Sequence, residues 1–435
     1  RTLIPAGAKE IVWHISPDVD QSWSREPNIS HSQVGYEPAL SKVAVIELDS
    51  NYAGGDKATL KRLNADGSYT DVFTAELGAA TSWKRYVYRN FDFSEFKTPG
   101  TYVIEYDGFV SDSFPIKKGA YDGTWQQSLS DYMAIQMDHM RIRDGYKIWR
   151  SAAHMDDALQ GPLESSWFDA GGMSGTVIES GIGINGRTEA YKPGEHIPGL
   201  NVGGFCDAGD YDIQTGQNVN LIRNLYYAYK EFDTGYDTLD VDWDGYNNVE
   251  LHRPDGTADI VQLIKHGILQ ILGQYENIGF LASILEVQTL RQYTQIGGPN
   301  DTDGRVYDPN LEENEIWGLT SGKKDDRYVF ASTKNASTNL GAAEIFAQSY
   351  MVLKDYDKET ADRCLAAAEK IWNEEPDSHV GTESEMSFFG MTFKTAPADW
   401  GAAVALFEAT GKDVYKDRVA ELLDVELQAG AGGGG

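Results

Sequence analysis

The chain has 435 residues, of which 41% are hydrophobic and 24% are charged, and its formal net charge is -30 at pH 7. This composition excludes a disordered or fibrous chain, and the length predicts two domains. The acidic balance argues against nucleic acid and anionic membrane surfaces as partners and leaves neutral polymers open, although solubility alone could explain it. The sequence contains no run of about 18 apolar residues, so it predicts no membrane-spanning segment. Cys206 and Cys364 are the only cysteines, which excludes a disulfide framework.

The first part of the chain, up to about residue 118, has the pattern of short β-strands. Its apolar runs are rich in β-forming residues and are separated by turns about every 8–12 residues. The strand candidates span 42–48, 58–63 and 101–106, and the turns are 64–67, 99–100 and 107–108. The last turn, Asp107-Gly108, predicts a hairpin into the segment 109–116. These signals predict a β-sandwich.

From Thr124 onward, the apolar residues recur at helical spacing. The predicted helices include residues 125–140, 219–229, 260–272, 340–350 and 361–372, one that opens at Pro397, and one over 413–427. A β-domain followed by a run of helices indicates separate domains, and we place them at 1–118 and 119–435. The long loops between the helices, rich in Gly, Asn and Asp, are where we expect binding and catalysis.

One loop contains a dense motif, Gly203-Gly204-Phe205-Cys206-Asp207-Ala208-Gly209-Asp210-Tyr211. Asp207 and Asp210 lie three residues apart, and we expect them on one side of the first turn of a helix. A helix N-terminus favours negative charge and therefore keeps a carboxylate ionised, the state that a general base needs. The alternative is a helix cap with a glycine-rich turn.

This motif resembles the Gly-Gly-aromatic-X-Asp-Ala-Gly-Asp-Tyr motif of family-nine glycoside hydrolases. The resemblance implies that Asp210 is the catalytic base and that Asp207 helps to hold the nucleophilic water. Cys206 departs from the family's usual Tyr or His, which puts a substrate contact in doubt but not the pair of carboxylates. The resemblance also implies substrate contacts by Tyr211, His154 and Arg327.

Further stretches extend the resemblance over nearly the whole chain. They are Ser32-Gln33-Val34-Gly35-Tyr36, Phe91-Asp92-Phe93-Ser94, Pro99-Gly100-Thr101-Tyr102, His154-Met155-Asp156-Asp157-Ala158, the segment 258–267 and Asp325-Asp326-Arg327-Tyr328. They imply an immunoglobulin-like β-sandwich over 1–118, followed by an (α/α)6 barrel over 119–435.

The barrel of the family has twelve helices, whereas the pattern here predicts seven, so we expect a barrel that is incomplete at the C-terminus. The family's general-acid Glu normally lies in the missing part. Asn314-Glu315 and Asn373-Glu374 resemble its Asn-Glu setting but come too early in the order of elements. We therefore expect the natural protein to continue beyond Leu427, and the chain as given to lack the acid and activity.

An acidic turn suggests a cation site. Aspartates at alternate positions followed by Gly245 match the opening of a calcium loop. Position twelve is Leu251, with Glu250 one residue early, so the full motif fails. A structural calcium and a solvated acidic turn both remain open. The candidate ligands are Asp240, Asp242, Asp244 and Asn248.

Aromatic side chains in or near the loops are candidates for packing on sugar rings. For each alone, packing in the core is the expected role, and for His154 a hydrogen-bonded structural role is the alternative to substrate contact. The tryptophans concerned are Trp149, Trp167, Trp317 and Trp400.

Together these observations predict an inverting glycoside hydrolase that cleaves a β-1,4-glucan, with no cofactor required for the chemistry. The expected location is secreted, periplasmic or cell-surface, in the manner of bacterial enzymes of this family. One alternative is an exo-acting β-glucosidase or β-glucosaminidase on the same scaffold. Another is a glycan-binding protein without catalysis. A polysaccharide or oligosaccharide is the only partner predicted, and no oligomeric state is indicated.

Overall fold

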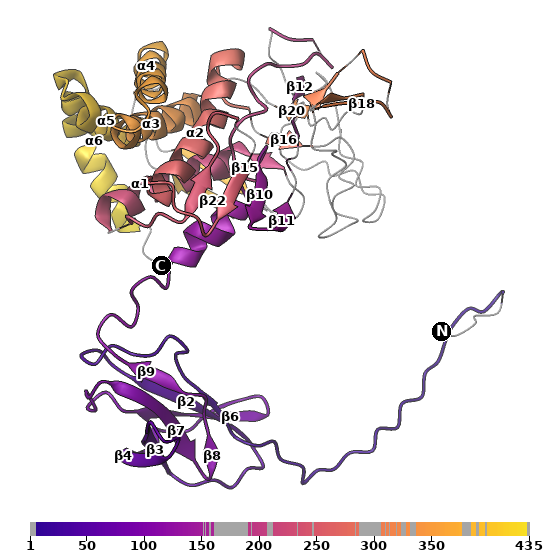
Figure 1. Cartoon of the computed structure of the whole chain (residues 1–435), viewed down its shortest axis with the longest axis vertical. Helices are drawn as coiled ribbons and strands as arrows, with labels where there is room; N and C mark the ends of the chain where they lie inside the picture. Colours follow the sequence, from indigo (N-terminus) through magenta and orange to yellow (C-terminus); the bar gives the residue numbers. More distant parts are fainter. Residues whose placement is uncertain are drawn as a thin grey trace. The chain divides into compact units, whose positions relative to one another are not determined.

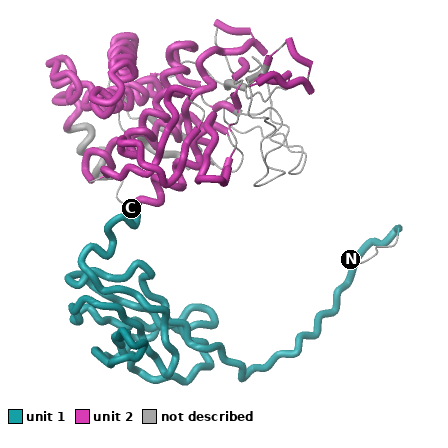
Figure 2. Tube along the Cα trace, viewed as in Figure 1, with its two compact units in different colours: residues 1–125 teal, residues 126–435 magenta. Residues whose placement is uncertain are grey.

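The structure is a computed structural model that describes most of the chain. The described residues are 6–150, 152, 154–155, 158–160, 190–192, 194–206, 212–232, 234–245, 248–282, 284–286, 306–308, 310–312, 314–318, 320–322, 328–330, 336–375, 384–388, 391–395 and 398–432. The chain divides into two compact units, residues 1–125 and 126–435 (Figure 2).

The first unit consists of two antiparallel sheets (Figure 1). One sheet has the strand order β1-β2-β6-β5, and the other has β4-β3-β7-β8, with β9 also paired to β7. The strands are β1 (Asn28–Ser30), β2 (Val43–Asp49), β3 (Lys57–Leu63), β4 (Tyr69–Glu76), β5 (Thr81–Trp83), β6 (Tyr86–Asp92), β7 (Gly100–Tyr106), β8 (Phe109–Val110) and β9 (Phe114–Ile116).

The two sheets face each other across one apolar core, so the predicted β-sandwich is confirmed. Alternate residues of β2 and β7 point inward, as the two-residue period of a strand requires. The inward side chains are Ala44, Ile46, Leu48, Tyr102, Ile104 and Tyr106, joined by Phe91 and Phe114 from β6 and β9.

The Asp107-Gly108 turn joins β7 to β8 as predicted. Both residues have positive φ, 49° and 83°, the backbone conformation of a two-residue hairpin turn. The segment 109–116 is not one strand, however: β8 and β9 each pair with β7 separately. In its middle, the Ser111 hydroxyl accepts a hydrogen bond from the Ile104 amide and takes the place of a backbone partner.

The second unit is mainly helical (Figure 1). Helix α1 packs against α2 and α3, helix α3 packs against α4 and α5, and helix α5 packs against α6. Its described α-helices are α1 (Thr215–Glu231), α2 (Asp259–Ile278), α3 (Ala336–Leu353), α4 (Lys358–Glu374), α5 (Ala398–Thr410) and α6 (Asp413–Gly432). All six coincide with segments in which helical spacing was found.

Helix α2 is central, because nearly all of its side chains are buried. Such a helix needs no polar face, and its sequence from Ile260 to Leu272 is apolar around most of its circumference. It ends at Gly279, whose φ of 83° is the left-handed conformation that terminates many helices.

The helix predicted over 125–140 is shorter in the structure than the sequence indicates. The helical residues there are 126–135, and their middle is a π-helix, η1 (Ser128–Met133). Met137 instead pairs as an isolated antiparallel bridge with Phe205, and His139 adopts a φ of 60°, which no helix continues through. A tertiary pairing therefore overrides the apolar spacing of this segment.

Short strands, which the spacing did not predict, lie between the helices. They form sheets with the orders β11-β10-β15-β14, β12-β20-β16-β13, β17-β19-β18 and β21-β22. Their bounds are β10 (Arg141–Asp144), β11 (Lys147–Arg150), β12 (Leu159–Gln160), β13 (Ile213–Gln214), β14 (Leu239–Val241), β15 (Asn248–Leu251), β16 (Ile284–Glu286), β17 (Val306–Tyr307), β18 (Ile316–Trp317), β19 (Thr320–Ser321), β20 (Tyr328–Phe330), β21 (Ser384–Phe388) and β22 (Met391–Thr395). Strands of two or three residues are too short to show an alternating pattern.

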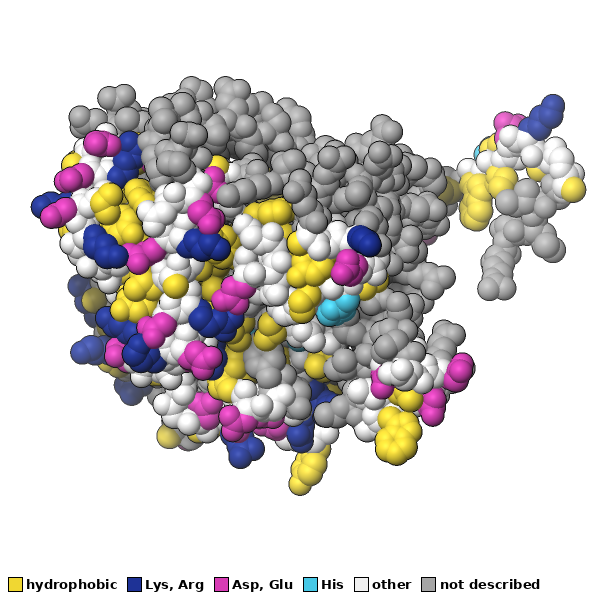
Figure 3. Space-filling model, turned by 90° about the horizontal axis from the view of Figure 1, so that it is seen from above, with side chains coloured by type: hydrophobic (Ala, Val, Ile, Leu, Met, Phe, Trp, Pro, Cys, Tyr) yellow, Lys and Arg dark blue, Asp and Glu magenta, His cyan; other side chains and the backbone are white. Residues whose placement is uncertain are grey.

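The surface of this unit mixes both signs of charge. On the face seen in Figure 3, Lys and Arg side chains lie among Asp and Glu side chains, with apolar ones between them. None of the described helices is both long and apolar enough for a membrane span.

Candidate active site

The central residues of the predicted site, Asp207, Asp210 and Tyr211, lie outside the described residues, as does Arg327. The structure describes both ends of the motif, however, from Gly203 to Cys206 and from Asp212 onward. These flanking segments show how the fold holds the loop that carries the two aspartates.

The glycine pair at the start of the motif packs directly on helix α2. Gly203 and Gly204 have φ values of 71° and 82°. A Cβ atom on Gly203 would lie 2.3 Å from the carbonyl oxygen of His266 and 2.8 Å from the amide nitrogen of Gln270. Only glycine satisfies both the positive φ and this close approach of backbone to backbone.

Two hydrogen bonds join this pair to His266 of α2. The Gly204 amide donates to the His266 carbonyl at 3.1 Å, and the His266 Nε2–H donates to the Gly204 carbonyl at 2.7 Å. Complete burial lowers the pKa of His266 to about 3, so the ring is neutral at ordinary pH and carries its proton on Nε2.

The next residue, Phe205, is held by an asparagine of α1. The Asn218 side chain accepts a hydrogen bond from the Phe205 amide at 2.8 Å and donates one to the Phe205 carbonyl at 3.0 Å. One buried amide thus satisfies both backbone groups of Phe205, which also forms the isolated bridge with Met137.

The far end of the motif is also fixed. Asp212 is 1% exposed, and Ile213, fully buried in β13, pairs with Leu285 of β16. Helix α1 begins only at Thr215, after an extended Gln214. Strand β13 therefore lies between the motif and α1, so the motif does not form the start of that helix; the two aspartates themselves lie outside the described residues.

Beside Cys206 lies a buried cluster of polar side chains. The Arg150 guanidinium donates to Asp138 Oδ1 at 2.9 Å and to Cys206 Sγ at 3.2 Å. The Nδ1–H of His154 donates to the same Asp138 oxygen at 3.2 Å, and His139 donates to the Gly203 carbonyl at 2.9 Å. These contacts are buried or partly buried, and the one from Arg150 reaches Cys206, the last described residue before Asp207.

His154 was predicted to contact substrate, with a structural role as the alternative. Its side chain is 2% exposed and points at Asp138, and its φ is 53°. This position supports the structural role. Asp138, His139 and Arg150 were not anticipated; the one signal for them is a polar Asp-His pair between two methionines, Met137 and Met140.

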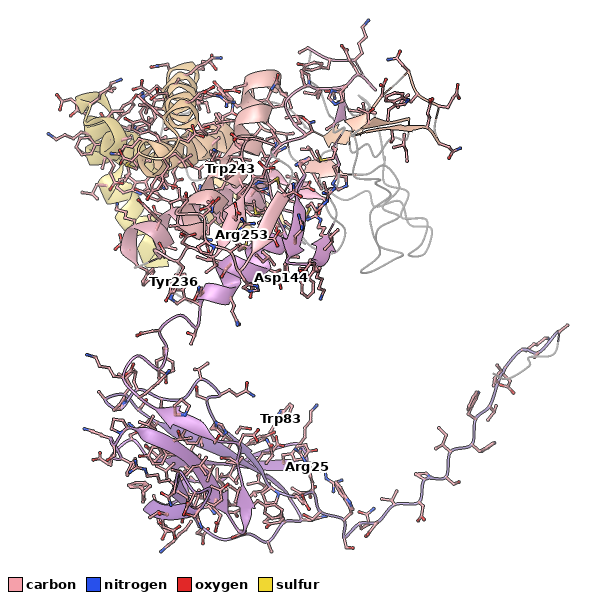
Figure 4. All side chains as sticks on the ribbon, viewed as in Figure 1. Arg25, Trp83, Asp144, Tyr236, Trp243 and Arg253 are labelled. Atoms are coloured by element: carbon pink, nitrogen blue, oxygen red, sulfur yellow. The ribbon has the colours of Figure 1, made fainter. Side chains whose placement is uncertain are left out.

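The predicted calcium turn is described for all four candidate ligands. Asp240 contacts Arg253 at 3.2 Å (Arg253 is labelled in Figure 4), and Asn248 lies 3.5 Å from the Arg141 guanidinium. Two of the candidates therefore already face cations. Within the described residues, no three His, Cys, Asp or Glu side chains are grouped to hold a metal ion. Calcium stays a prediction.

Glu374 and Glu315, the two glutamates that directly follow an asparagine, lie in different environments. Glu374, near the end of α4, accepts a hydrogen bond from the Tyr275 hydroxyl at 3.2 Å. Glu315 is exposed and accepts from the Glu312 amide at 3.3 Å. Each carboxylate is thus occupied by a local structural contact.

Two of the loop tryptophans are exposed, contrary to the expected core packing. Trp149 of β11 is 50% exposed and Trp317 of β18 is 71% exposed. Trp400 is partly buried in α5, and Trp167 lies outside the described residues. Lys147 lies over the Trp149 ring at 3.1 Å from its centroid.

Comparison with known proteins identifies two family models along the chain. Glycosyl hydrolase family 9 matches residues 121–430, and the cellulase N-terminal ig-like domain matches residues 24–111. The order of the two matches is the order of the two compact units.

Individual relatives are distant in sequence. A xyloglucan-specific endo-β-1,4-glucanase of Bacteroides ovatus is 22% identical over 410 residues, which are 89% of this chain and 58% of that protein. A metagenome-derived family 9 endoglucanase has a TM-score of 0.59 at 19% identity, covering 92% of this chain and 64% of its own. A mutant thermostable endoglucanase from Alicyclobacillus acidocaldarius has a TM-score of 0.55 at 16% identity, covering 91% and 62%. The chain thus spans less than two thirds of each relative's length.

Proposed function

The chain belongs to glycosyl hydrolase family 9, and we propose that the full-length protein hydrolyses a β-1,4-linked glucan with inversion at the anomeric carbon. In this proposal Asp210 is the general base, Asp207 helps to hold the attacking water, and Tyr211 and Arg327 contact the sugar. The family's (α/α)6 barrel is the proposed scaffold of the second unit.

One observation carries this proposal: the fold holds both ends of the Asp207–Asp210 loop in the protein interior. Gly203 and Gly204 are fixed on α2, and Ile213 is fixed in a sheet with β16. A loop anchored at both ends can present two carboxylates to a substrate without a large cost in ordering the chain. A glycine-rich helix cap would not need this double anchoring.

The proposed reaction needs an acid as well as a base. The base takes a proton from water while the acid protonates the leaving sugar oxygen, and the two carboxyl groups stand roughly 6.5–9.5 Å apart. We assign the acid to neither Glu315 nor Glu374, because both come too early in the order of elements.

The relatives support the class of substrate that we propose. One of them is named for endo-β-1,4-glucanase action on xyloglucan. We therefore propose a β-1,4-glucan backbone for this protein, met outside the cytoplasm by a secreted, periplasmic or surface-bound enzyme. The exo-acting β-glucosidase or β-glucosaminidase and the glycan-binding protein without activity remain the competing functions.

The test is an assay of the full-length protein on xyloglucan, carboxymethyl cellulose and small aryl β-glucosides, with proton NMR of the first product. We expect cleavage of a polymeric glucan and release of the α-anomer before mutarotation. Release of the β-anomer would contradict inversion. Activity confined to the small glycosides would favour the exo-acting alternative, and binding without cleavage would favour a glycan-binding protein.

A further inference from the structure

A buried ionic cluster lies directly beside the proposed catalytic loop. We call Asp138, Arg150, His154 and Cys206 the Arg150 cluster. The side chains of Asp138 and His154 are 0% and 2% exposed, and that of Arg150 is 10% exposed. Cys206, 4% exposed, immediately precedes Asp207 in the chain.

The guanidinium of Arg150 bridges two segments that are far apart in the sequence. On one segment it donates to the carbonyls of Ile135 and Met137, at 3.2 and 3.3 Å, and to the Asp138 carboxylate. On the other segment it donates to Cys206 Sγ. A single side chain therefore ties residues 135–138 to the end of the segment 203–206.

Backbone contacts join the same two segments, but only at a few points. The Asp138 amide donates to the Gly204 carbonyl and the Cys206 amide to the Gln136 carbonyl, both at 2.9 Å. They flank the isolated bridge between Met137 and Phe205. The contact between Arg150 and Cys206 Sγ adds a side-chain link to this short ladder, at the last described residue before Asp207.

Arginine is suited to this task, and lysine is not. The planar guanidinium directs several N–H groups at once to fixed acceptors, whereas an ammonium group is a compact point charge. A buried cation also needs a partner, which Asp138 supplies, and removal of either charge would leave the other uncompensated in the interior. The geometry thus specifies the residue type as well as its place.

We propose that Arg150 is a positioning residue, which acts through Cys206 to fix the end of the segment 203–206, the point at which the chain continues to Asp207. This inference rests on the proposed function, because its consequence is a change in the turnover of glucan. Arg150 itself contacts neither substrate nor water in this account.

The experiment compares conservative and disruptive changes in the full-length enzyme on a glucan that the wild type cleaves. Cys206→Ala removes the one acceptor of Arg150 that lies on the segment 203–206, whereas Cys206→Ser keeps an acceptor there. We expect Cys206→Ala to lower kcat about tenfold, the effect of one lost hydrogen bond to a charged group, with KM changed less than about twofold. Cys206→Ser should stay within about threefold of wild type.

Arg150→Lys keeps the charge but not the bridging geometry, and we expect it to lower kcat about 100-fold, as for a displacement of catalytic groups by about 1 Å. Arg150→Met removes the guanidinium that pairs with Asp138 and is a test of folding only. If Arg150→Met does not fold, the two variants of Cys206 still test the proposal.

Matched controls come from elsewhere in the same unit. Cys364 is the second buried cysteine, and Arg223 forms a partly buried pair with Glu344 at 2.8 Å. Cys364→Ala and Arg223→Met should lower the melting temperature and leave kcat unchanged.

Three outcomes overturn the proposal: Cys206→Ala behaves like Cys364→Ala in kcat, Cys206→Ser loses as much as Cys206→Ala, or Arg150→Lys keeps wild-type kcat. A wild type that cleaves no glucan would instead refute the proposed function, so the two failures are distinguishable.

Discussion

The packing of the motif on helix α2 leads to a quantitative prediction for Gly203→Ala. The added Cβ would lie 2.3 Å from the His266 carbonyl oxygen, and neither backbone segment can move aside as a flexible side chain would. In addition, the φ of 71° is a left-handed conformation that costs an L-residue roughly 1–2 kcal/mol. Overpacking adds about 1–3 kcal/mol, so we expect a total loss of about 2–5 kcal/mol in the free energy of unfolding.

A second glycine separates the two contributions. Gly279 ends the same helix with a φ of 83°, and a Cβ on it would meet no atom within 4 Å. Gly279→Ala therefore carries only the conformational cost, roughly 1–2 kcal/mol. The measurement is urea unfolding of the wild type and both variants, with the midpoint and slope compared. If Gly203→Ala is no less stable than Gly279→Ala, the close packing of the motif on α2 is not as described.

The remaining predictions concern His266 and the acidic turn. Burial lowers the pKa of His266 to about 3 in the folded protein. Below pH 6.5, the ordinary pKa of histidine, the unfolded chain therefore binds a proton on this side chain that the folded chain does not bind. The free energy of unfolding consequently falls as the pH drops from about 6.5 toward 3. Between pH 7 and pH 5 this loss is about 2 kcal/mol, and His266→Gln should lack it; an equal loss in both proteins would contradict the burial argument. For the turn over 240–248, a bound calcium predicts that a chelator lowers the melting temperature. An unchanged melting curve together with no metal by elemental analysis would end that prediction.

Long elements were predictable from the sequence because their periods are visible over several turns. Helix α2 shows this well, since the apolar residues from Ile260 to Leu272 recur over more than three turns. In the first unit, β2, β3 and β7 were predictable from their β-forming residues, and the hairpin from β7 to β8 was predictable from the Asp107-Gly108 turn. The helix prediction failed over part of the segment 125–140, because Met137 pairs there with Phe205, which is distant in the sequence.

The candidate site was predictable only in part, for a similar reason. A motif shows which residues are adjacent, and it marked Gly203 to Tyr211. It does not show why the glycines are needed, because that reason lies in the His266 carbonyl of another element. Arg150 could not be predicted, because a single arginine in a strand belongs to no sequence pattern. Its partners Asp138 and Cys206 become its neighbours only in the fold.

The central claim is that Asp210 activates the water that cleaves a β-1,4-glucan. The most direct measurement is the rate of glucan hydrolysis by Asp210→Asn in the full-length enzyme, together with its affinity for the same glucan. The amide has the shape of the carboxylate but cannot take up the proton of water, so we expect hydrolysis to be abolished while binding stays nearly unchanged. A variant that keeps more than about a few per cent of the wild-type rate would show that Asp210 is not the base.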